Sequence, residues 1–435
     1  MRTHMASDMA KEKDGSKVIL GGWVDSVREH GSLAFLIIRD SSGTAQITAK
    51  KGAVDGLILK TIKSLVKESV VLVEGVVHRT ERTERGVEIV PKRIEILSVS
   101  EKILPLDPNV ESELDTRLDW RPIDLRKPQN LAIFKIQAKI LEGFEGYLRK
   151  EGFIQIFTPC ILGGASEGGA EIFKLKYYKT KAFLRQDPQL HRQLTLIGGY
   201  DKIFDIGPSW RAEESRTPRH LSEHRGVAPE ISFIKDETDI MRLEEQMIVN
   251  AMKKVKEECE NELKILGKEV KLPKPPFPEL RFPKIYEILE NLGKKIPFGE
   301  DYDRESEKLL YDYVKEKYKS EFFFVNRFPF AAKPFYVMKV DGEPQWARSV
   351  DLIFKGIEQS SGGQREHRHE KLLGNIKDKK MKMSDIEWFV KHFKYGVPPH
   401  GGFCIGIERF TMQLLDIENI KEAVLFARTP DRLIP

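Results

Sequence analysis

The chain has 435 residues, of which 40% are hydrophobic and 32% are charged, and its formal net charge is +5. This length predicts two or three domains, and the mild positive charge permits contact with nucleic acid without requiring it. No run of about eighteen uncharged apolar residues could cross a bilayer, and residues 1–17 fit neither a secretory signal nor a transit peptide, so we expect a cytoplasmic protein.

Short apolar blocks, separated by turns rich in glycine and charged residues, occupy the first part of the chain. They are Val18–Leu20, Leu33–Ile38, Ala45–Ala49, Val70–Val77 and Val87–Leu97. Short strands at this spacing predict a small β-barrel, and the OB-fold is the commonest barrel of this kind that binds nucleic acid. A barrel that serves only as a spacer is the alternative.

A stretch rich in proline and in both charges, without a sustained period, follows the barrel and predicts a linker. We therefore expect a barrel domain at residues 1–103, a linker at 104–126 and a second domain at 127–435. Apolar residues at helical spacing then predict a helix over Leu131–Gly152.

The second domain alternates predicted strands with longer helices. The further helices are expected over Asp239–Glu262, Glu305–Lys317 and Met383–Lys391. The strands are expected over Phe153–Phe157, Ala182–Arg185, Lys202–Ile206, Ile231–Ile234, Phe322–Val325, Phe335–Val340, Ser349–Phe354 and Phe403–Ile407. Strands grouped around helices without a regular βαβ repeat favour an α+β domain with a largely antiparallel sheet. Neither GxxxxGK[ST] nor GxGxxG occurs, so any use of ATP would not depend on those phosphate loops.

Arginines follow two of the predicted strands in positions suited to phosphate. Arg211 and Glu213 come after one strand, beneath a polar loop that leads to His220. A guanidinium there could bind phosphate oxygens through two nitrogens, although charged turn residues are usually only solvated. Arg409 would stand at the start of an apolar helix, where the helix dipole favours a polyanion.

Oxygen ligands gather on a strand and turn later in the chain. Asp351, Glu358 and Ser361 are hard ligands of the kind that Mg²⁺ prefers when it also contacts substrate phosphates. The alternative is that these carboxylates are surface groups paired with Lys355 or Arg365.

In this order the three groups resemble the motifs of class II aminoacyl-tRNA synthetases. Pro159 resembles the end of motif 1, Trp210–Glu223 resembles motif 2, and Gly406–Arg409 resembles motif 3. Four further stretches resemble the aspartyl and asparaginyl branch in its archaeal form, namely Ser166–Gly169, Gln186–Leu190, Ser360–Arg365 and Pro398–Phe403. The resemblance extends over nearly the whole chain.

The resemblance implies a role for each residue of these motifs. ATP would be bound by Arg211, Glu213, His220, Glu358 and Arg409, of which Arg211, Glu213 and Arg409 would be catalytic. Mg²⁺ would be held by Asp351, Glu358 and Ser361. The amino acid would be bound by Glu167, Gln189, Arg192 and Arg365. In the barrel, Phe35, Gln46 and Glu88 would hold the central anticodon base of tRNA, and motif 1 would form a homodimer.

Three departures from the family pattern concern the amino-acid and adenine ends. The family's Gln-Ser-Pro-Gln-Leu-Tyr-Lys becomes Gln186–Arg192, which replaces a substrate-facing lysine with Arg192. The family's aspartate after motif 2 is Ala228, and His224 stands where an aromatic residue often stacks on adenine.

The charges of the amino-acid pocket favour aspartate. Arg365 and Arg192 would present two cations to the substrate side chain, and a compensating negative charge would be missing at Ala228. A neutral carboxamide would leave a guanidinium poorly paired. The alternative is that Arg192 turns toward Glu223 or solvent.

The expected function is activation of L-aspartate with ATP and transfer of the product to the 3′ end of tRNA(Asp), with tRNA(Asn) left open as a second acceptor. The alternatives are an asparaginyl-tRNA synthetase, a relative that makes asparagine without tRNA, and a catalytically silent RNA-binding paralogue. The barrel argues against the second, and the intact catalytic motifs argue against the third.

Overall fold

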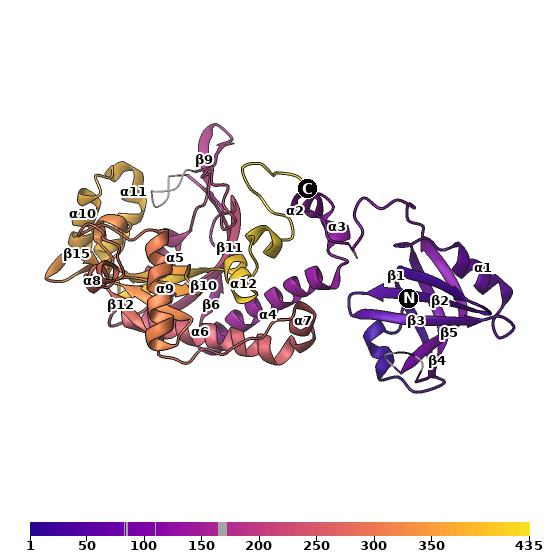
Figure 1. Cartoon of the computed structure of the whole chain (residues 1–435). Helices are drawn as coiled ribbons and strands as arrows, with labels where there is room; N and C mark the ends of the chain where they lie inside the picture. Colours follow the sequence, from indigo (N-terminus) through magenta and orange to yellow (C-terminus); the bar gives the residue numbers. More distant parts are fainter. Residues whose placement is uncertain (82, 84–85, 109, 164–171) are drawn as a thin grey trace. The chain divides into compact units, whose positions relative to one another are not determined.

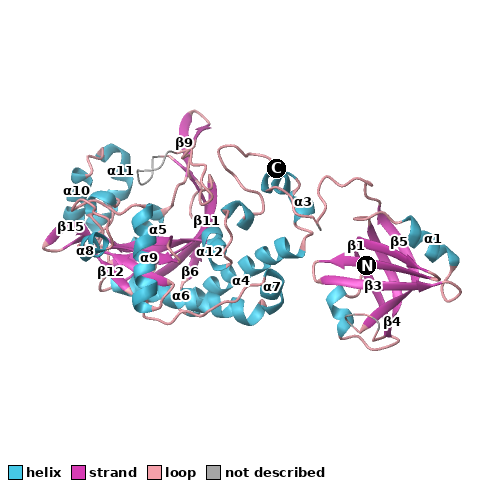
Figure 2. Ribbon diagram, viewed as in Figure 1, coloured by secondary structure: helices cyan, strands magenta, loops and turns pink. Residues whose placement is uncertain are grey.

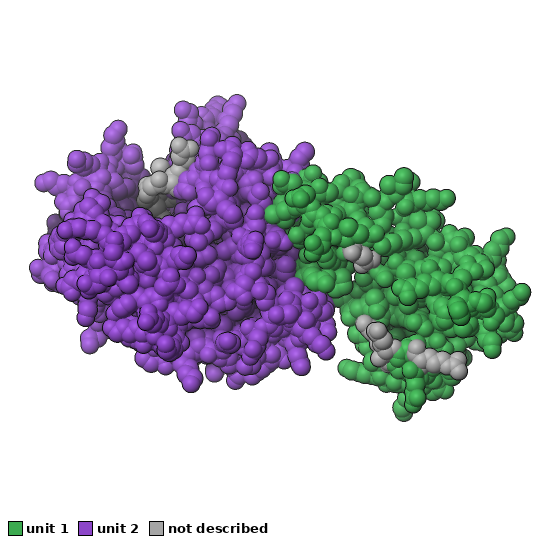
Figure 3. Space-filling model, in the orientation of Figure 1, with its two compact units in different colours: residues 1–131 green, residues 132–435 purple. Residues whose placement is uncertain are grey.

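The computed structural model describes residues 1–81, 83, 86–108, 110–163 and 172–435. It divides into two compact units, Met1–Leu131 and Ala132–Pro435, which Figure 3 colours separately. Among the described residues, no helix is both long and apolar enough to cross a membrane.

Unit 1 contains a closed barrel of five strands in the order β1-β2-β3-β5-β4. The strands are β1 (Lys17–His30), β2 (Leu33–Asp40), β3 (Gly43–Lys50), β4 (Val70–Arg79) and β5 (Val87–Ser98), and a helix α1 (Gly56–Ser64) accompanies them. Alternation along β2 buries Ala34, Leu36 and Ile38 in the barrel core. Because successive side chains point to opposite faces, the residues between them face outward. The predicted barrel is confirmed.

The stretch predicted as a linker contains two short helices, α2 (Leu114–Asp119) and α3 (Arg121–Asp124). These helices lack the apolar period of an amphipathic helix. Ion pairs stabilise them instead. Arg121 is buried and donates to Asp124 at 2.5 Å. Arg126, just after α3, donates to the buried Glu68 of the barrel segment at 2.9 Å.

Unit 2 is built on an eight-stranded sheet in the order β12-β13-β16-β17-β18-β11-β10-β6. These strands are β6 (Ile154–Ile156), β10 (Lys202–Trp210), β11 (Glu223–Ser232), β12 (Glu279–Arg281), β13 (Phe322–Asn326), β16 (Ser349–Phe354), β17 (Ile357–Arg365) and β18 (His400–Gly406). All neighbouring pairs are antiparallel except β12 with β13 and β6 with β10. The predicted α+β domain with a largely antiparallel sheet is therefore confirmed.

Helices and two small sheets complete unit 2 (Figures 1 and 2). The helices are α4 (Pro128–Lys150), α5 (Gln189–Ile197), α6 (Glu237–Glu258), α7 (Glu260–Leu266), α8 (Lys284–Asn291), α9 (Arg304–Tyr318), α10 (His369–Asp378), α11 (Met383–Val390) and α12 (Ile407–Leu414). The small sheets consist of β7 (Ile161–Leu162), β8 (Lys174–Tyr177) and β9 (Thr180–Leu184), and of β14 (Lys339–Val340) and β15 (Glu343–Ala347).

The main core lies between α4, α6 and one face of the large sheet. Phe144 of α4 and Ile248 of α6 belong to one buried cluster with Val227, Leu352 and Ile405 of the sheet. Since side chains alternate along a strand, the neighbours of these core residues project from the opposite face. That opposite face carries the polar residues described below.

Several stretches differ from the expected secondary structure. The strand expected over Ile231–Ile234 is the end of β11, which begins at Glu223, and the helix expected over Asp239–Glu262 is divided at Cys259 into α6 and α7. The sequence predicts a strand and turn for the oxygen ligands, but Glu358 and Ser361 both lie on the strand β17. This strand lies in the middle of the sheet. Conversely, the apolar run Phe335–Val340 forms a strand only at Lys339–Val340, and Phe335 is buried by tertiary packing without joining a strand.

Candidate active site

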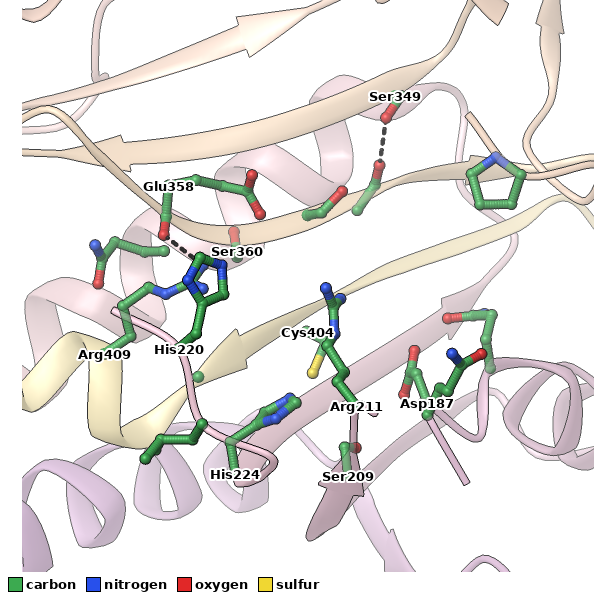
Figure 4. A pocket seen from close by; sticks show the side chains of 18 of the residues that line it. Asp187, Ser209, Arg211, His220, His224, Ser349, Glu358, Ser360, Cys404 and Arg409 are labelled. Atoms are coloured by element: carbon green, nitrogen blue, oxygen red, sulfur yellow. Dashed lines mark hydrogen bonds between the residues drawn. The ribbon is translucent and has the colours of Figure 1, made fainter. Parts of the chain in front are cut away.

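A cavity of about 420 Å³ opens on the polar face of the unit 2 sheet. Its lining includes Asp187, Gln189, Arg211, Glu213, His220, His224, Glu358, Ser361, Arg365 and Arg409. In Figure 4, Arg409, His220 and Glu358 lie at one end of the cavity and Asp187 at the other, with Arg211 between them. The fold therefore brings together residues that the sequence had assigned to ATP and to the amino acid.

Arg211 follows β10 directly and keeps its guanidinium in the open part of the cavity. Its backbone N–H donates to Ser222 at 3.0 Å, which fixes the position of the residue between β10 and β11. The side chain is 54% exposed and lies 3.7 Å from Glu213. An anchored backbone with an open guanidinium suits an arginine that has to receive phosphate oxygens.

Burial and nearby cationic side chains lower the pKa of both histidines of this region. Burial, and next the charge of Arg409, lower the pKa of His220, whose Nδ1 lies 2.5 Å from the hydroxyl of Thr217. Burial, and next Arg211, lower the pKa of His224 to about 4. A neutral imidazole at 224 can lie against a base without adding charge.

Arg409 stands in the first turn of α12, as the sequence predicted. Its Nη1 donates to the backbone carbonyl of Glu358 at 3.1 Å, which ties the helix to β17 (Figure 4). Arg409 therefore lies at the start of a helix and beside the predicted metal ligands.

The predicted Mg²⁺ ligands lie on adjacent strands. Asp351 of β16 is opposite Ser361 of β17, and Glu358 is two pairs further along the ladder. Among the described residues, Oδ1 of Asp351 is buried without a hydrogen-bond partner, while Oδ2 accepts from Lys333 at 2.8 Å. Burial, and next the charge of Asp351, raise the pKa of Glu358 to about 7. An unpartnered buried carboxylate oxygen near a second carboxylate fits a divalent cation.

The structure argues against the alternative partners of these carboxylates. Lys355 pairs with Asp416 at 2.6 Å, and Arg365 pairs with Glu230 at 2.8 Å. Lys333, which the sequence reading had not singled out, is the cation that meets Asp351. Within the described chain there is no group of three or more His, Cys, Asp or Glu side chains that could hold a metal ion. The Mg²⁺ ligands that the sequence predicts, two carboxylates and a hydroxyl, stay a prediction.

A buried cluster forms the amino-acid end of the cavity. Arg365 donates from Nε to Glu230 at 2.8 Å and from Nη2 to Gln189 at 3.0 Å. Gln189 also donates to Glu230 at 2.9 Å. Gly402 leaves space for this cluster, because an added Cβ would lie 2.4 Å from Glu230. Glu230 was not predicted from the sequence. A glutamate among the apolar residues of β11 could have indicated a buried polar site.

Arg192 does not face the substrate space as expected. Its side chain is 1% exposed, and both terminal nitrogens donate to the carboxylate of Asp187 at 2.7 Å. Nor does it turn to Glu223, which instead accepts from Trp210 at 3.2 Å. The expectation of a missing negative charge is therefore wrong, because Asp187 supplies one.

The remaining predicted residues lie elsewhere. Glu167 is outside the described residues. In the barrel, Thr48 of β3 is opposite Phe35 of β2, accepts from Gln46 at 3.2 Å and donates to Glu88 at 2.6 Å. The three predicted anticodon residues thus surround one threonine that the sequence reading had not singled out.

Comparison with known proteins gives matches over both units. A family model described as tRNA synthetases class II (D, K and N) matches residues 113–430, and an OB-fold nucleic acid binding domain matches residues 18–97. The chain is 47% identical over 437 residues to the aspartate–tRNA(Asp) ligase of Pyrococcus furiosus, covering 100% of both chains. It is 40% identical to the aspartate–tRNA(Asp/Asn) ligase of Methanopyrus kandleri, covering 99% of this chain and 98% of that one.

Solved structures resemble the fold over nearly its full length. The asparaginyl-tRNA synthetase of Pyrococcus horikoshii, complexed with asparaginyl-adenylate, matches with a TM-score of 0.90 and 33% identity, covering 97% of each chain. The aspartyl-tRNA synthetase of Entamoeba histolytica matches with a TM-score of 0.90 and 28% identity, covering 100% of this chain and 93% of that one.

Proposed function

The chain belongs to the class II tRNA synthetases of the D, K and N group, with an OB-fold barrel before the synthetase domain, and on that premise we propose that it is an aspartate–tRNA ligase. It activates L-aspartate with ATP and transfers the aspartyl group to the 3′ end of tRNA(Asp). The observation that carries the proposal is a single cavity that joins Arg211 and Arg409 to the buried Arg365.

The proposed chemistry needs no nucleophilic side chain. The α-carboxylate of aspartate attacks the α-phosphorus of ATP in line, and pyrophosphate leaves. Arg211 donates to the phosphoryl oxygens as their charge grows, and Arg409 holds the distal phosphates. Mg²⁺, when bound by Asp351, Glu358 and Ser361, supplies further positive charge to the phosphates. The terminal hydroxyl of tRNA then attacks the aminoacyl carbonyl and releases AMP.

Arg365 supports aspartate over asparagine. Glu230 and Gln189 hold its Nε and Nη2, and among the described residues no hydrogen bond to its Nη1 is present. This nitrogen can donate to the β-carboxylate of aspartate. A carboxamide would leave the charge poorly paired, at a cost of about 1–3 kcal/mol.

ATP–pyrophosphate exchange with L-aspartate and with L-asparagine tests the proposed substrate. We expect faster exchange with aspartate, and equal or faster exchange with asparagine would reject the assignment. Charging of tRNA(Asp) and tRNA(Asn) in parallel then identifies the acceptor. If asparagine formed from aspartate in the absence of tRNA, that result would favour the alternative of a relative that makes asparagine without tRNA.

Phe35→Ala should weaken tRNA charging and leave exchange without tRNA unchanged. Stacking of a base on an aromatic ring is worth about 1–3 kcal/mol. Phe35 belongs to unit 1, whereas the residues that line the cavity belong to unit 2. Steady-state charging over a range of tRNA concentrations measures the effect as a raised KM. Leu33→Ala, on the same strand, is the matched control. A parallel loss of exchange in Phe35→Ala would show that Phe35 serves the fold instead.

A homodimer through motif 1 is part of the proposal. β6 is an edge strand of the large sheet, and it carries Ile154 at 53% exposure and is followed by Phe157 at 85%. Open edges with apolar side chains are usually covered in soluble proteins. Sedimentation should show that the wild type is a dimer and that Phe157→Glu dissociates into monomers more readily. The cytoplasm, where ATP and tRNA are available, is the proposed location.

A further inference from the structure

The salt bridge between Asp187 and Arg192 lies at the start of α5. It is a two-nitrogen pair, with both N–O distances at 2.7 Å. Arg192 is buried, whereas the Asp187 side chain is 29% exposed and lines the cavity. Burial opposes ionisation of Asp187, but Arg192 outweighs it and holds the pKa of this carboxyl below its usual value. The pair is therefore ionised and fixed in geometry.

The second terminal nitrogen of Arg192 links this pair to the amino-acid cluster. Nη2 of Arg192 also donates to Oε1 of Gln189 at 2.7 Å, and the same oxygen accepts from Arg365 at 3.0 Å. One amide oxygen is thus shared by two buried guanidinium groups. The position of Arg192 consequently bears directly on the position of Arg365.

Position 228 lies on the same polar face. Val227 pairs with Ile405 and Glu230 with Gly402, so Ala228 is opposite Cys404, a cavity residue. In the described part of the chain, Nε of Arg192 is buried without a hydrogen-bond partner. Ala228 is also opposite Asp205 of β10, which pairs with Arg185 at 3.3 Å. Because side chains alternate along a strand, a carboxylate placed at 228 would lie on the face of β11 that carries Glu230.

We propose that Asp187 is a positioning residue for the amino-acid pocket, because its carboxylate holds Arg192 and so keeps Arg192 from drawing Glu230 away from Arg365. With Arg192 occupied in this way, Glu230 can orient Arg365 toward the β-carboxylate of aspartate. This inference rests on the proposed function, because it takes aspartate as the substrate.

Loss of Asp187 has a specific consequence for Arg365. A buried guanidinium without a carboxylate is strongly unfavourable, so Arg192 turns to the next available partner. That partner is Glu230, whose Oε2 lies 3.8 Å from Nε of Arg192. Glu230 is then drawn away from Arg365, and the pocket loses its orientation for the substrate side chain.

The test exchanges the carboxylate between the two positions. In Asp187→Ser we expect the KM for aspartate in ATP–pyrophosphate exchange to rise about tenfold or more, with the KM for ATP within about twofold. Adding Ala228→Asp to that variant should bring the KM for aspartate back to within about threefold of wild type. Ala228→Asp alone adds a further carboxylate to Asp187 and Glu230 and should raise the KM for aspartate.

Asp236→Ser is the matched control, because Asp236 also stands at a helix start but caps α6 and is not among the cavity residues. Thermal unfolding of every variant separates loss of fold from loss of binding. If Asp187→Ser alone does not fold, recovery of folding and of KM in the double variant still supports the exchange.

Two results overturn the inference. One is an unchanged KM for aspartate in a folded Asp187→Ser variant, and the other is a folded double variant that is no better than the single one. The wild type is measured beside each variant. A wild type that does not activate aspartate rejects the proposed function, whereas normal wild-type exchange with either of the two results above rejects only the role of Asp187.

Discussion

Replacing Arg211 with alanine is expected to lower the rate of ATP–pyrophosphate exchange about 10²–10³-fold, since loss of one preorganised donor to a developing charge costs about 2.7–4 kcal/mol. The fold should remain intact. The side chain is 54% exposed, and its ion pair with Glu213 spans 3.7 Å at the surface. Such exposed pairs contribute little to the free energy of unfolding.

The rate of exchange and the melting temperature together measure this effect. Arg216→Ala is the control from the same loop, because Arg216 is exposed and pairs with Asp431 rather than lining the cavity. Arg211→Lys keeps the charge but not the two-nitrogen geometry, so its rate should fall between those of wild type and alanine. Exchange near the wild-type rate in Arg211→Ala would remove Arg211 from the mechanism.

Secondary structure was predictable from the sequence where a segment is apolar because it is buried. Ser349–Phe354 was predicted as a strand and is β16, all of whose residues are buried. β17, beside it, could not be predicted in the same way. Its residues serve the cavity, so Ser361 and Arg365 replace the apolar alternation that reveals a strand.

The motif residues were predictable, but their partners were not. Gln189 and Glu230 are 41 residues apart, and Lys333 and Asp351 are 18 apart. Contacts over such separations depend on sheet order and register, which no local pattern specifies. The resemblance to a family therefore located Gln189 and Asp351, while Glu230 and Lys333 became apparent only in the folded chain.

The same reasoning explains the error over Arg192. The sequence reading counted charges by comparison with the family pattern, and it registered the loss at Ala228 without crediting Asp187. Whether two residues compensate for one another depends on their distance in space. Asp187 lies just before α5 and Arg192 lies in its first turns, so the fold of the loop brings the carboxylate next to the guanidinium.

Arg365→Ala is expected to reduce both stability and aspartate activation. It leaves Glu230, which is fully buried, without its principal cation. Breaking a buried ion pair from one side costs about 3–5 kcal/mol of unfolding free energy. The kcat/KM for aspartate should fall about 10³-fold or more, because the only proposed donor to the β-carboxylate is also lost. Urea unfolding and ATP–pyrophosphate exchange measure the two effects.

A second change separates these two effects. Glu230→Gln removes the buried charge that Arg365→Ala leaves unpaired, and the amide can still accept from Gln189, so the double variant should be more stable than Arg365→Ala alone. Aspartate activation should stay low in it, because neither substitution restores a cation. If exchange with aspartate recovered together with stability, Arg365 would support the fold of the pocket without recognising the substrate. If stability recovers and exchange does not, the guanidinium itself selects the carboxylate.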